Sequence, residues 1–286
     1  MLRSQLCSVE SLRSPALVAW ARRLRPMWTT TDEDPRDVLL HRKMWEWLFI
    51  AEVLRERGLL GPGRSGLGFG VGQEPLVALF AAQGCELVAS DQPHDMAVST
   101  GWSDSAMEWA GGLQNLNTFG LCPEDDFARR VRYRDVDMNA IPRDLRDFDF
   151  TWSSCALEHL GTLAAGMDFV VNQMACLAPG GTAVHSTEYL VSSNDVTVEA
   201  GGTVFYRRRD IESLIDRLRG AGHAVDIDFR EGTTPEDLHV DVPPYTDVHL
   251  RTQLGGHVTT SLVLIVTKGS AGPGRIRSLL RRVRRD

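Results

Sequence analysis

Residues 65–91, SGLGFGVGQEPLVALFAAQGCELVASD, decide the fold. Gly68, Gly70 and Gly72 follow one another at two-residue spacing, between a predicted strand and a predicted helix that starts near Glu74. Glycine allows a positive φ and a close approach of the backbone to a ligand, and the first turn of a helix has unpaired N–H groups. The stretch therefore predicts a cradle for a nucleotide-like cofactor.

An acidic residue follows the cradle at the place where a ribose would lie. The next predicted strand, 87–90, brings Asp91 to its carboxyl end, where a carboxylate can accept hydrogen bonds from both ribose hydroxyls. The third glycine comes two residues after the second, whereas dinucleotide enzymes space these glycines three apart. A nucleoside cofactor other than NAD is therefore favoured, and an NAD-dependent oxidoreductase is the weaker alternative.

Two segments with strand signals follow. Residues 131–142, VRYRDVDMNAIP, predict a short strand that ends at Asp137 and Met138, although an aspartate in an ordinary turn explains Asp137 equally well. Residues 148–161, FDFTWSSCALEHLG, predict a fourth strand, a loop after Ser153 and the start of a helix. Both segments would deliver side chains to the same sheet edge as the glycines.

The remaining signals continue the alternation of strands and helices. The Pro179-Gly180-Gly181 turn precedes a predicted fifth strand at 182–185. An amphipathic helix begins near Ile211, and SLVLIVTK at 261–268 predicts the last strand. This alternation predicts a three-layer α/β fold with a mostly parallel sheet.

The glycine spacing and the order of these segments resemble class I S-adenosylmethionine-dependent methyltransferases. That family usually has an acidic residue two positions before its first glycine, where this chain has Gly66. Four further motifs are similar to a bacterial type 11-like group that methylates small molecules and saccharides and is found with glycosyltransferases of surface-polysaccharide pathways. These motifs are KMWE at 43–46, EHLG at 158–161, STE at 186–188 and YRRRD at 206–210.

The resemblance, which covers about residues 40–268, implies a Rossmann-like methyltransferase fold whose mostly parallel, seven-stranded sheet has an antiparallel last strand. It implies S-adenosylmethionine as cofactor and O-methylation of a saccharide or glycosylated small molecule as the reaction. A cofactor-binding protein of this fold without catalysis, acting as a regulator or scaffold, is the alternative. The cofactor residues that the resemblance implies are Gly68, Gly70, Gly72, Asp91, Asp137, Met138 and Ser153.

Methyl transfer to a hydroxyl requires an aligned acceptor and a group that removes its proton. The groups expected at this edge are Glu158, His159, His185, Glu188 and His249, of which Glu188, His159 and His249 are the chosen candidates. Glu188 is expected beyond the end of the fifth strand and exposed, whereas His159 can equally bond a carbonyl and His185 can face the core. An alternative in which Mg²⁺ orients a diol stays open, but no metal site is predicted, because the nitrogen and oxygen ligand types near this edge match no compact motif. Those residues are His185, Glu188, His239, Asp241, Asp247 and His249.

The chain divides into three regions. Residues 1–60 predict an N-terminal helical segment that acts as a lid, with aromatic side chains in a helix interface and charged ones in water, although His41, Lys43, Trp45 and Glu46 could instead face cofactor or substrate. The remainder comprises the methyltransferase domain at 61–268 and a basic tail at 269–286. That tail either contacts an anionic membrane surface or a partner, or is a frayed solvated helix.

Composition narrows the function classes. The 286 residues carry a net charge of −7, which gives no basic field for nucleic acid. The DVPPY segment at 241–245 comes too long after the fourth strand to hold a flipped base. Five scattered cysteines and the lack of an apolar run of about 20 residues predict a cytoplasmic enzyme with reduced thiols. The acceptor and the oligomeric state are left open.

Overall fold

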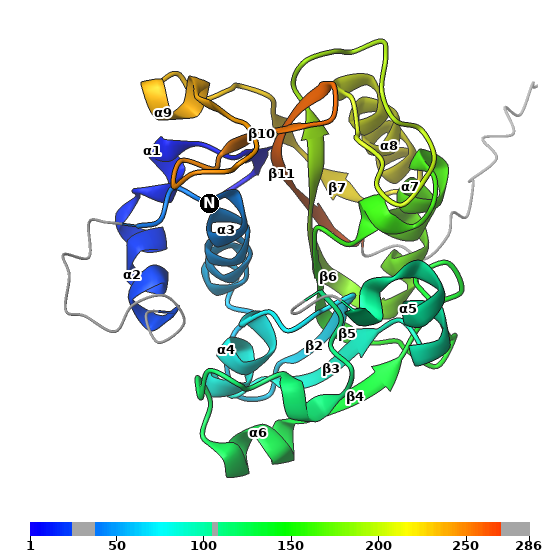
Figure 1. The fold of residues 1–286 in the computed structure, drawn as a ribbon. Helices are drawn as coiled ribbons and strands as arrows, with labels where there is room; N and C mark the ends of the chain where they lie inside the picture. The colour runs from blue at the N-terminus through cyan, green and yellow to red at the C-terminus, as the bar shows by residue number, and fades with distance from the viewer. Residues whose placement is uncertain (25–37, 105–107, 270–286) are drawn as a thin grey trace, which may run out of the picture.

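The computed structural model describes residues 1–24, 38–104 and 108–269. Within them the chain forms one sheet with helices on both faces (Figure 1). The strands are β1 (Ser4–Leu6), β2 (Ser65–Phe69), β3 (Glu86–Asp91), β4 (Val131–Asp135), β5 (Phe148–Ser154), β6 (Leu177–Leu190), β7 (Ala224–Val225), β8 (Ile227–Asp228), β9 (Val240–Asp241), β10 (Arg251–Leu254) and β11 (His257–Thr267). The α-helices are α1 (Val9–Leu12), α2 (Pro15–Leu24), α3 (Arg42–Glu56), α4 (Leu76–Ala82), α5 (His94–Thr100), α6 (Glu124–Arg130), α7 (Leu163–Asn172), α8 (Arg208–Gly220) and α9 (Pro235–Leu238). Short 3₁₀ turns include η4 (Leu157–His159) and η5 (Gln173–Cys176).

The centre of the sheet is parallel and its last strand is reversed. The order is β4-β3-β2-β5-β6, all parallel, followed by β11, which runs antiparallel to β6. The expected three-layer Rossmann-like fold is confirmed. The described residues form eleven strands rather than seven, because the short strands β1, β7, β8, β9 and β10 pair beside β11 or with one another.

The order of the strands places a topological switch point between β2 and β5. The chain leaves β2 toward β3 and β4 on one side, and then returns to continue with β5 and β6 on the other side. In open α/β sheets, ligands bind at such a switch point, outside the carboxyl ends of the strands. The loops that follow β2 and β5 are therefore the place to look for a site.

Each face of the sheet has its own apolar core. Phe150 and Trp152 of β5 pack with Phe80 of α4 on one face, with ring centroids 5.2 to 5.8 Å apart. On the other face, Leu67 and Phe69 of β2 contribute to a core shared with α7 and α8. The predicted amphipathic helix is confirmed, since α8 buries its apolar side chains at Ile211, Leu214, Ile215 and Leu218.

Helix α3 is buried along most of its length and packs against β5, β6 and β11, with α2 and α4 beside it (Figure 1). Its aromatic residues fill this interface as expected; Trp45 and Phe49 are fully buried. The expectation that its charged residues lie in water is wrong for Glu46 and Glu52, which are also buried. The lid role of residues 1–60 stays a prediction.

Strand β6 is longer than the sequence predicts. It begins at Leu177 and ends at Leu190, and the Pro179-Gly180-Gly181 turn lies inside it. There the pairing with β5 shifts register, and Gly180 has a φ of 80°. The glycine pair therefore forms an irregularity within the strand rather than a turn before it.

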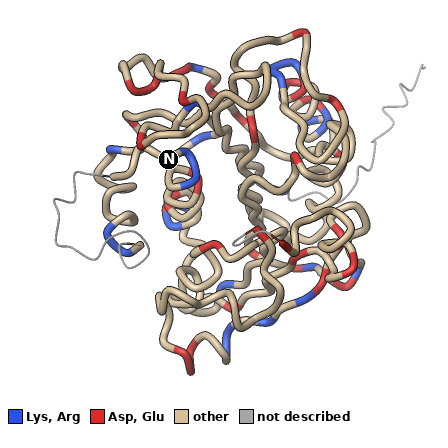
Figure 2. The backbone as a smooth tube through the Cα atoms, in the orientation of Figure 1, with Lys and Arg blue, Asp and Glu red and all other residues tan. Residues whose placement is uncertain are grey.

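Two predictions concern regions that the structure describes only in part. The basic tail at 269–286 lies outside the described residues except for Gly269. None of the described helices is long and apolar enough to cross a membrane. Along the described chain, basic and acidic residues are interspersed (Figure 2).

The position before the glycine loop generates a stability prediction. A Cβ on Gly66 would lie 2.3 Å from Cζ of the Phe150 ring, which is fully buried and cannot move aside freely. We expect G66A to lower the free energy of unfolding by about 1–3 kcal/mol, measured by urea denaturation. G220A is the control, because nothing lies within 4 Å of its new methyl group. Equal stabilities of G66A and G220A would contradict this packing constraint.

Candidate active site at the carboxyl edge of the sheet

The segment between β2 and α4, residues 70–75, leaves β2 at the switch point of the sheet and is called the glycine loop. Gly70 and Gly72 have φ values of 54° and 50°, a left-handed conformation that favours glycine. Gly68 serves packing instead, since a Cβ there would lie 2.4 Å from the ring of Trp152. The three glycines that the sequence singles out are thus required for two turns and one close contact.

The helix after this loop begins later than predicted. Helix α4 starts at Leu76, and Pro75 at its N-cap makes no side-chain capping bond. Glu74 therefore belongs to the loop rather than to the helix. With only seven residues, α4 offers a weaker anion-binding end than the sequence analysis expects.

Asp91 ends β3 and braces the glycine loop. Its carboxylate accepts backbone N–H bonds from Gly72 (3.0 Å), Gln92 (2.8 Å) and Ala110 (3.0 Å). Burial raises the pKa of Asp91 to about 6, against the opposing effect of these bonds. Oδ2 takes two of the bonds and Oδ1 takes one, so Oδ1 keeps a lone pair for a further donor.

Met138 lies against the same loop, and Asp137 beside it forms a turn. The sulfur of Met138 is 3.4 Å from where a Cβ of Gly70 would stand. Strand β4 ends at Asp135, earlier than predicted. Asp137 accepts a bond from the Asn139 N–H at 2.8 Å, so it adopts the turn that the sequence analysis held open.

Ser153 lies near the carboxyl end of β5, but its side chain is engaged in the core. Its hydroxyl is fully buried and shares a hydrogen bond of 2.8 Å with Nδ1 of His185. His185 packs edge-on against Phe169, and burial lowers its pKa to about 3. His185 is therefore a neutral core residue, as one sequence interpretation held, and Ser153 is its partner.

A buried carboxylate joins α3 to three strands of the sheet. Glu46 is fully buried, and although burial opposes its ionisation, Lys43 and Arg42 lower its pKa to about 2. The groups that donate to this carboxylate are Ser154 Oγ of β5 (3.0 Å), Ser186 Oγ of β6 (2.8 Å), Ser261 Oγ of β11, Cys155 Sγ (3.2 Å) and Arg42 Nη1 (3.4 Å).

The network around Glu46 reaches the glycine loop. The ammonium group of Lys43 lies 3.8 Å from Glu46 and 3.7 Å from Glu74 in the loop. The Cβ of Ala156, which follows β5, lies 2.8 Å from where a Cβ of Gly70 would stand. The buried charges therefore lie beside the glycine loop, at the switch point between β2 and β5.

Glu188 occupies a different place from the one predicted. It lies within β6 rather than beyond the strand end, and only 4% of it is exposed. Burial raises its pKa, and an ion pair with Arg42 opposes that rise. The prediction of an exposed Glu188 is wrong, because β6 continues along β11 as far as Leu190.

Two further side chains lie beside Glu188. Glu158 of η4 is fully buried and accepts a bond from the Thr187 hydroxyl at 3.0 Å. Cys155 has a φ of 48°, an uncommon conformation for a residue with a side chain. The sequence analysis counts Glu158 among the groups at this edge, treats Cys155 only as a reduced thiol and assigns no role to Arg42. The signal for Cys155 was present, since it directly follows β5.

The two candidate histidines have other partners. Nδ1 of His159 lies 2.8 Å from the Gly202 carbonyl oxygen, which is the carbonyl bond that the sequence analysis held open. Nδ1 of His249 lies 2.6 Å from Asp241, and its ring stacks on His41 with centroids 4.6 Å apart. Burial, with His249 nearby, lowers the pKa of His41 to about 4.

The six residues of the metal alternative do not come together in the structure. Of its six residues, the contacts bring together Asp241 and His249, while His185 lies in the core and His239 and Asp247 are exposed. Within the described ranges, the group of possible ligands that does converge is a different one. It comprises Cys155, Glu158 and Glu188.

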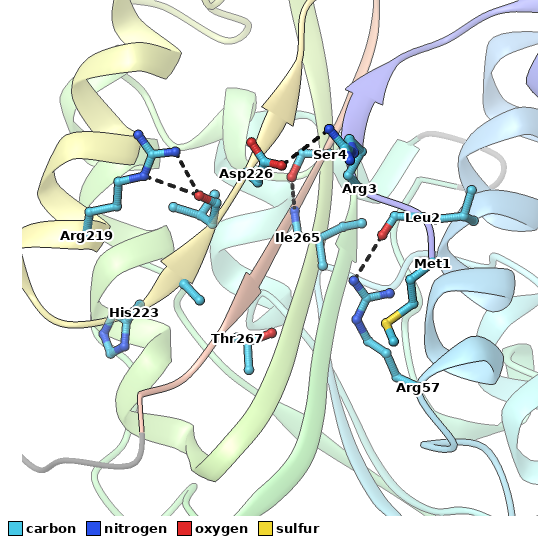
Figure 3. A pocket seen from close by; sticks show the side chains of 12 residues that line it. Met1, Leu2, Arg3, Ser4, Arg57, Arg219, His223, Asp226, Ile265 and Thr267 are labelled. Atoms are coloured by element: carbon cyan, nitrogen blue, oxygen red, sulfur yellow. Dashed lines mark hydrogen bonds and ion pairs between the residues drawn. The ribbon is translucent and has the colours of Figure 1, made fainter.

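A hollow of about 420 Å³ lies at the other end of the sheet (Figure 3). Thr267 on its wall pairs with Thr182, early in β6, so the hollow faces away from the glycine loop. Its arginines are engaged: Arg57 donates to the Leu2 carbonyl at 3.1 Å, and Arg219 donates to Val225 at 3.0 Å. We therefore assign it no part in the site.

No protein-family model and no curated protein sequence matches the chain. Solved methyltransferase structures resemble it in shape. A magnesium protoporphyrin IX methyltransferase from Synechocystis with bound SAH is 12% identical, with a TM-score of 0.48 over 91% of this chain and 97% of its own. An S-adenosylmethionine-dependent methyltransferase from Clostridium acetobutylicum is 14% identical, with a TM-score of 0.45 over 88% and 98% of the two chains. A glycopeptide N-methyltransferase is 14% identical, with a TM-score of 0.44 over 76% and 94%. Because these scores lie below 0.5, the case for a function depends on the site itself.

Glu74 generates a prediction about pH. Burial raises its pKa from 4.5 to about 7, although Lys43 opposes this. A carboxyl group whose pKa is raised by folding stabilises the fold below its unfolded pKa, and that contribution is lost as the pH rises through the folded value. Between pH 4.5 and 8, wild type should therefore lose about 3 kcal/mol of unfolding free energy relative to E74Q.

Urea denaturation of wild type and E74Q at a series of pH values checks this prediction. The comparison cancels the contributions of the other titrating groups. A difference between the two proteins that does not change with pH would mean that Glu74 keeps an ordinary pKa, held by Lys43.

Proposed function

We propose that this chain binds S-adenosylmethionine at the carboxyl ends of β2 and β3 and transfers its methyl group to a small-molecule acceptor. The observation that supports this most is the convergence of the glycine loop, Asp91 and Met138 at the switch point of the sheet. A Cβ at Gly70 would lie 3.4 Å from the sulfur of Met138, so glycine at this position keeps the space beside Met138 free. The residues present fit a nucleoside with an attached amino acid.

Each part of the cofactor has a partner in this proposal. The backbone around Gly68, Gly70 and Gly72 holds the amino-acid end, and Oδ1 of Asp91 accepts from the ribose. Asp137 and Met138 border the adenine, the first through its carboxylate and the second through its thioether. Ser153 supports this edge through His185. When bound, the cofactor supplies an electrophilic methyl group.

The acceptor that we propose is a saccharide or glycosylated small molecule with a free hydroxyl group. Glu188 is the proposed base, because its Oε2 is buried and has no hydrogen-bond partner among the described residues. Burial raises its pKa, and a higher pKa makes a carboxylate a stronger base. Arg42 holds the other oxygen and so orients the carboxylate. His159 and His249 are weaker candidates, since Nδ1 of each already has a partner.

The alternatives make different demands on the same loop. An NAD-dependent enzyme would need room for a pyrophosphate beside the glycines. A protein that binds the cofactor without catalysis would keep the loop and leave Glu188 as a structural ion pair with Arg42. Binding of the cofactor separates the first alternative from our proposal, and turnover separates the second.

Isothermal titration with S-adenosylmethionine, S-adenosylhomocysteine and NAD tests the proposed cofactor. We expect micromolar binding of the first two and none of NAD. Binding of NAD alone would replace the proposal with the oxidoreductase alternative. If none of the three binds to folded protein, the site is not a cofactor site. Once binding is established, transfer of a labelled methyl group to a panel of saccharides tests catalysis.

Asp91 provides the sharpest variant for this assay. D91A removes the acceptor of the proposed ribose bonds, each worth about 1.5–3 kcal/mol to a charged group, so affinity for S-adenosylmethionine should fall at least about tenfold. The control is D135A, because Asp135 is exposed at the end of the neighbouring strand. Thermal unfolding must first confirm that D91A folds, since Asp91 also braces Gly72. Unchanged affinity in folded D91A would remove Asp91 from the site.

A further inference from the structure

Cys155, Glu158 and Glu188 converge on one point beside the proposed cofactor site. One possible ligand atom of each lies within 4.8 Å of the others. The three residues are 9%, 0% and 4% exposed. They come from the loop after β5, from η4 and from β6, so the sheet itself brings them together.

The carboxylates of Glu158 and Glu188 each have a partner for one oxygen only. One oxygen of Glu158 accepts from Thr187, and one oxygen of Glu188 pairs with Arg42. The second oxygens, Oε1 of Glu158 and Oε2 of Glu188, are buried without a hydrogen-bond partner among the described residues. An unpaired buried carboxylate oxygen is costly, and such an atom in a native structure calls for an unseen partner.

The charges of the network favour a cation as that partner. Acidic groups outnumber basic ones here, since Arg42 lies among Glu46, Glu158 and Glu188, and Lys43 lies between Glu46 and Glu74. A bound cation would offset part of this excess of acidic groups. Arg42 contacts two of the three residues, since it pairs with the opposite oxygen of Glu188 and donates to Cys155 Sγ at 3.6 Å. An ion bound to this sulfur would replace the second contact and leave the first in place.

We propose that Cys155, Glu158 and Glu188 bind a zinc ion. One thiolate and two carboxylates suit zinc, which accepts sulfur and oxygen ligands, whereas magnesium prefers oxygen alone. Three protein ligands leave a fourth position open, as in catalytic zinc sites. The left-handed backbone at Cys155 is a further sign of function, since a strained residue of this kind persists only where its surroundings hold it.

Binding at this site involves a proton. In the metal-free protein the Cys155 thiol donates to Glu46, and burial together with the neighbouring acids raises its pKa. Formation of the zinc–sulfur bond breaks the S–H bond, and the proton passes to the solvent. Glu46 then keeps its three serine hydroxyls and Arg42 as partners.

An ion here would also act on the acceptor. Zinc lowers the pKa of an oxygen that it binds, so a hydroxyl in the fourth position would lose its proton more readily. Glu188 would then be a ligand rather than the base. This role depends on the proposed methyl transfer, whereas the binding of zinc does not.

The test uses the full chain after removal of metal with a chelator. Zinc chloride is titrated by calorimetry in two buffers of different ionisation enthalpy, and cobalt chloride is titrated while the near-ultraviolet spectrum is recorded. We expect one ion per chain, release of a proton and a thiolate-to-cobalt absorption band. Folded wild-type protein that binds no zinc, or binds it without a thiolate band from cobalt, would overturn the proposal.

Variants locate the site. C155S should abolish the cobalt band, and both C155S and E158Q should lower zinc affinity more than about tenfold. C176S is the matched control, because Cys176 is equally buried but lies in η5, away from the cluster, and its band and affinity should equal those of wild type. D241N guards against zinc held by the Asp241–His249 pair.

Titration with S-adenosylmethionine accompanies each variant. Thermal unfolding shows that C155S and E158Q are folded, and the titration separates the two proposals. Zinc binding without cofactor binding would sink the proposed methyl transfer and leave the metal site standing. Cofactor binding without zinc binding would leave the proposed methyl transfer standing and overturn the metal site. If zinc affinity stays unchanged in C155S and E158Q but falls in D241N, the metal binds at the Asp241–His249 pair, and the inference is overturned.

Discussion

The carboxylate of Glu46 is the interaction on which the site depends. It is buried between α3 and the sheet, and serine hydroxyls of β5, β6 and β11 all donate to it. Removing one partner of a buried ionic network typically costs about 3–5 kcal/mol, because the remaining charges are left uncompensated. Glu46 therefore sets where α3 lies along the sheet, and with α3 the positions of Arg42 and Lys43.

Arg42 and Lys43 extend this constraint to β6 and to the glycine loop. Arg42 orients Glu188 on β6, and Lys43 faces Glu74 in the glycine loop. A network of this kind contributes less to net stability than its number of bonds suggests, since each charge had to leave water. Its effect is to fix one arrangement of acidic groups beside the place where the cofactor would bind.

The sequence predicted the fold and the glycine-loop side of the site better than it predicted the side that Glu46 and Glu188 form. Glycines at fixed spacing and Asp91 after a strand are local signals with a direct structural meaning, and both lie where expected. The burial of Glu46 and Glu188 escaped prediction because charged residues usually lie in water, and the polar STE motif does not show the apolar pattern of a buried strand. Their burial follows from contacts between segments more than 100 residues apart, which periodicity cannot reveal.

The span of these contacts also bears on how the molecule is made. Glu46 and Ser261 are 215 residues apart, so on a ribosome that adds about 5–20 residues per second the serine follows the glutamate by about 10–40 s. Until β6 has been made, α3, which is buried on nearly every side in the folded protein, has neither β6 nor β11 to cover it, and β11 is missing for the whole interval. The nascent chain thus exposes a hydrophobic helix that contains the charged residue Glu46. Such a segment is suited to chaperone binding until the last strand completes the sheet.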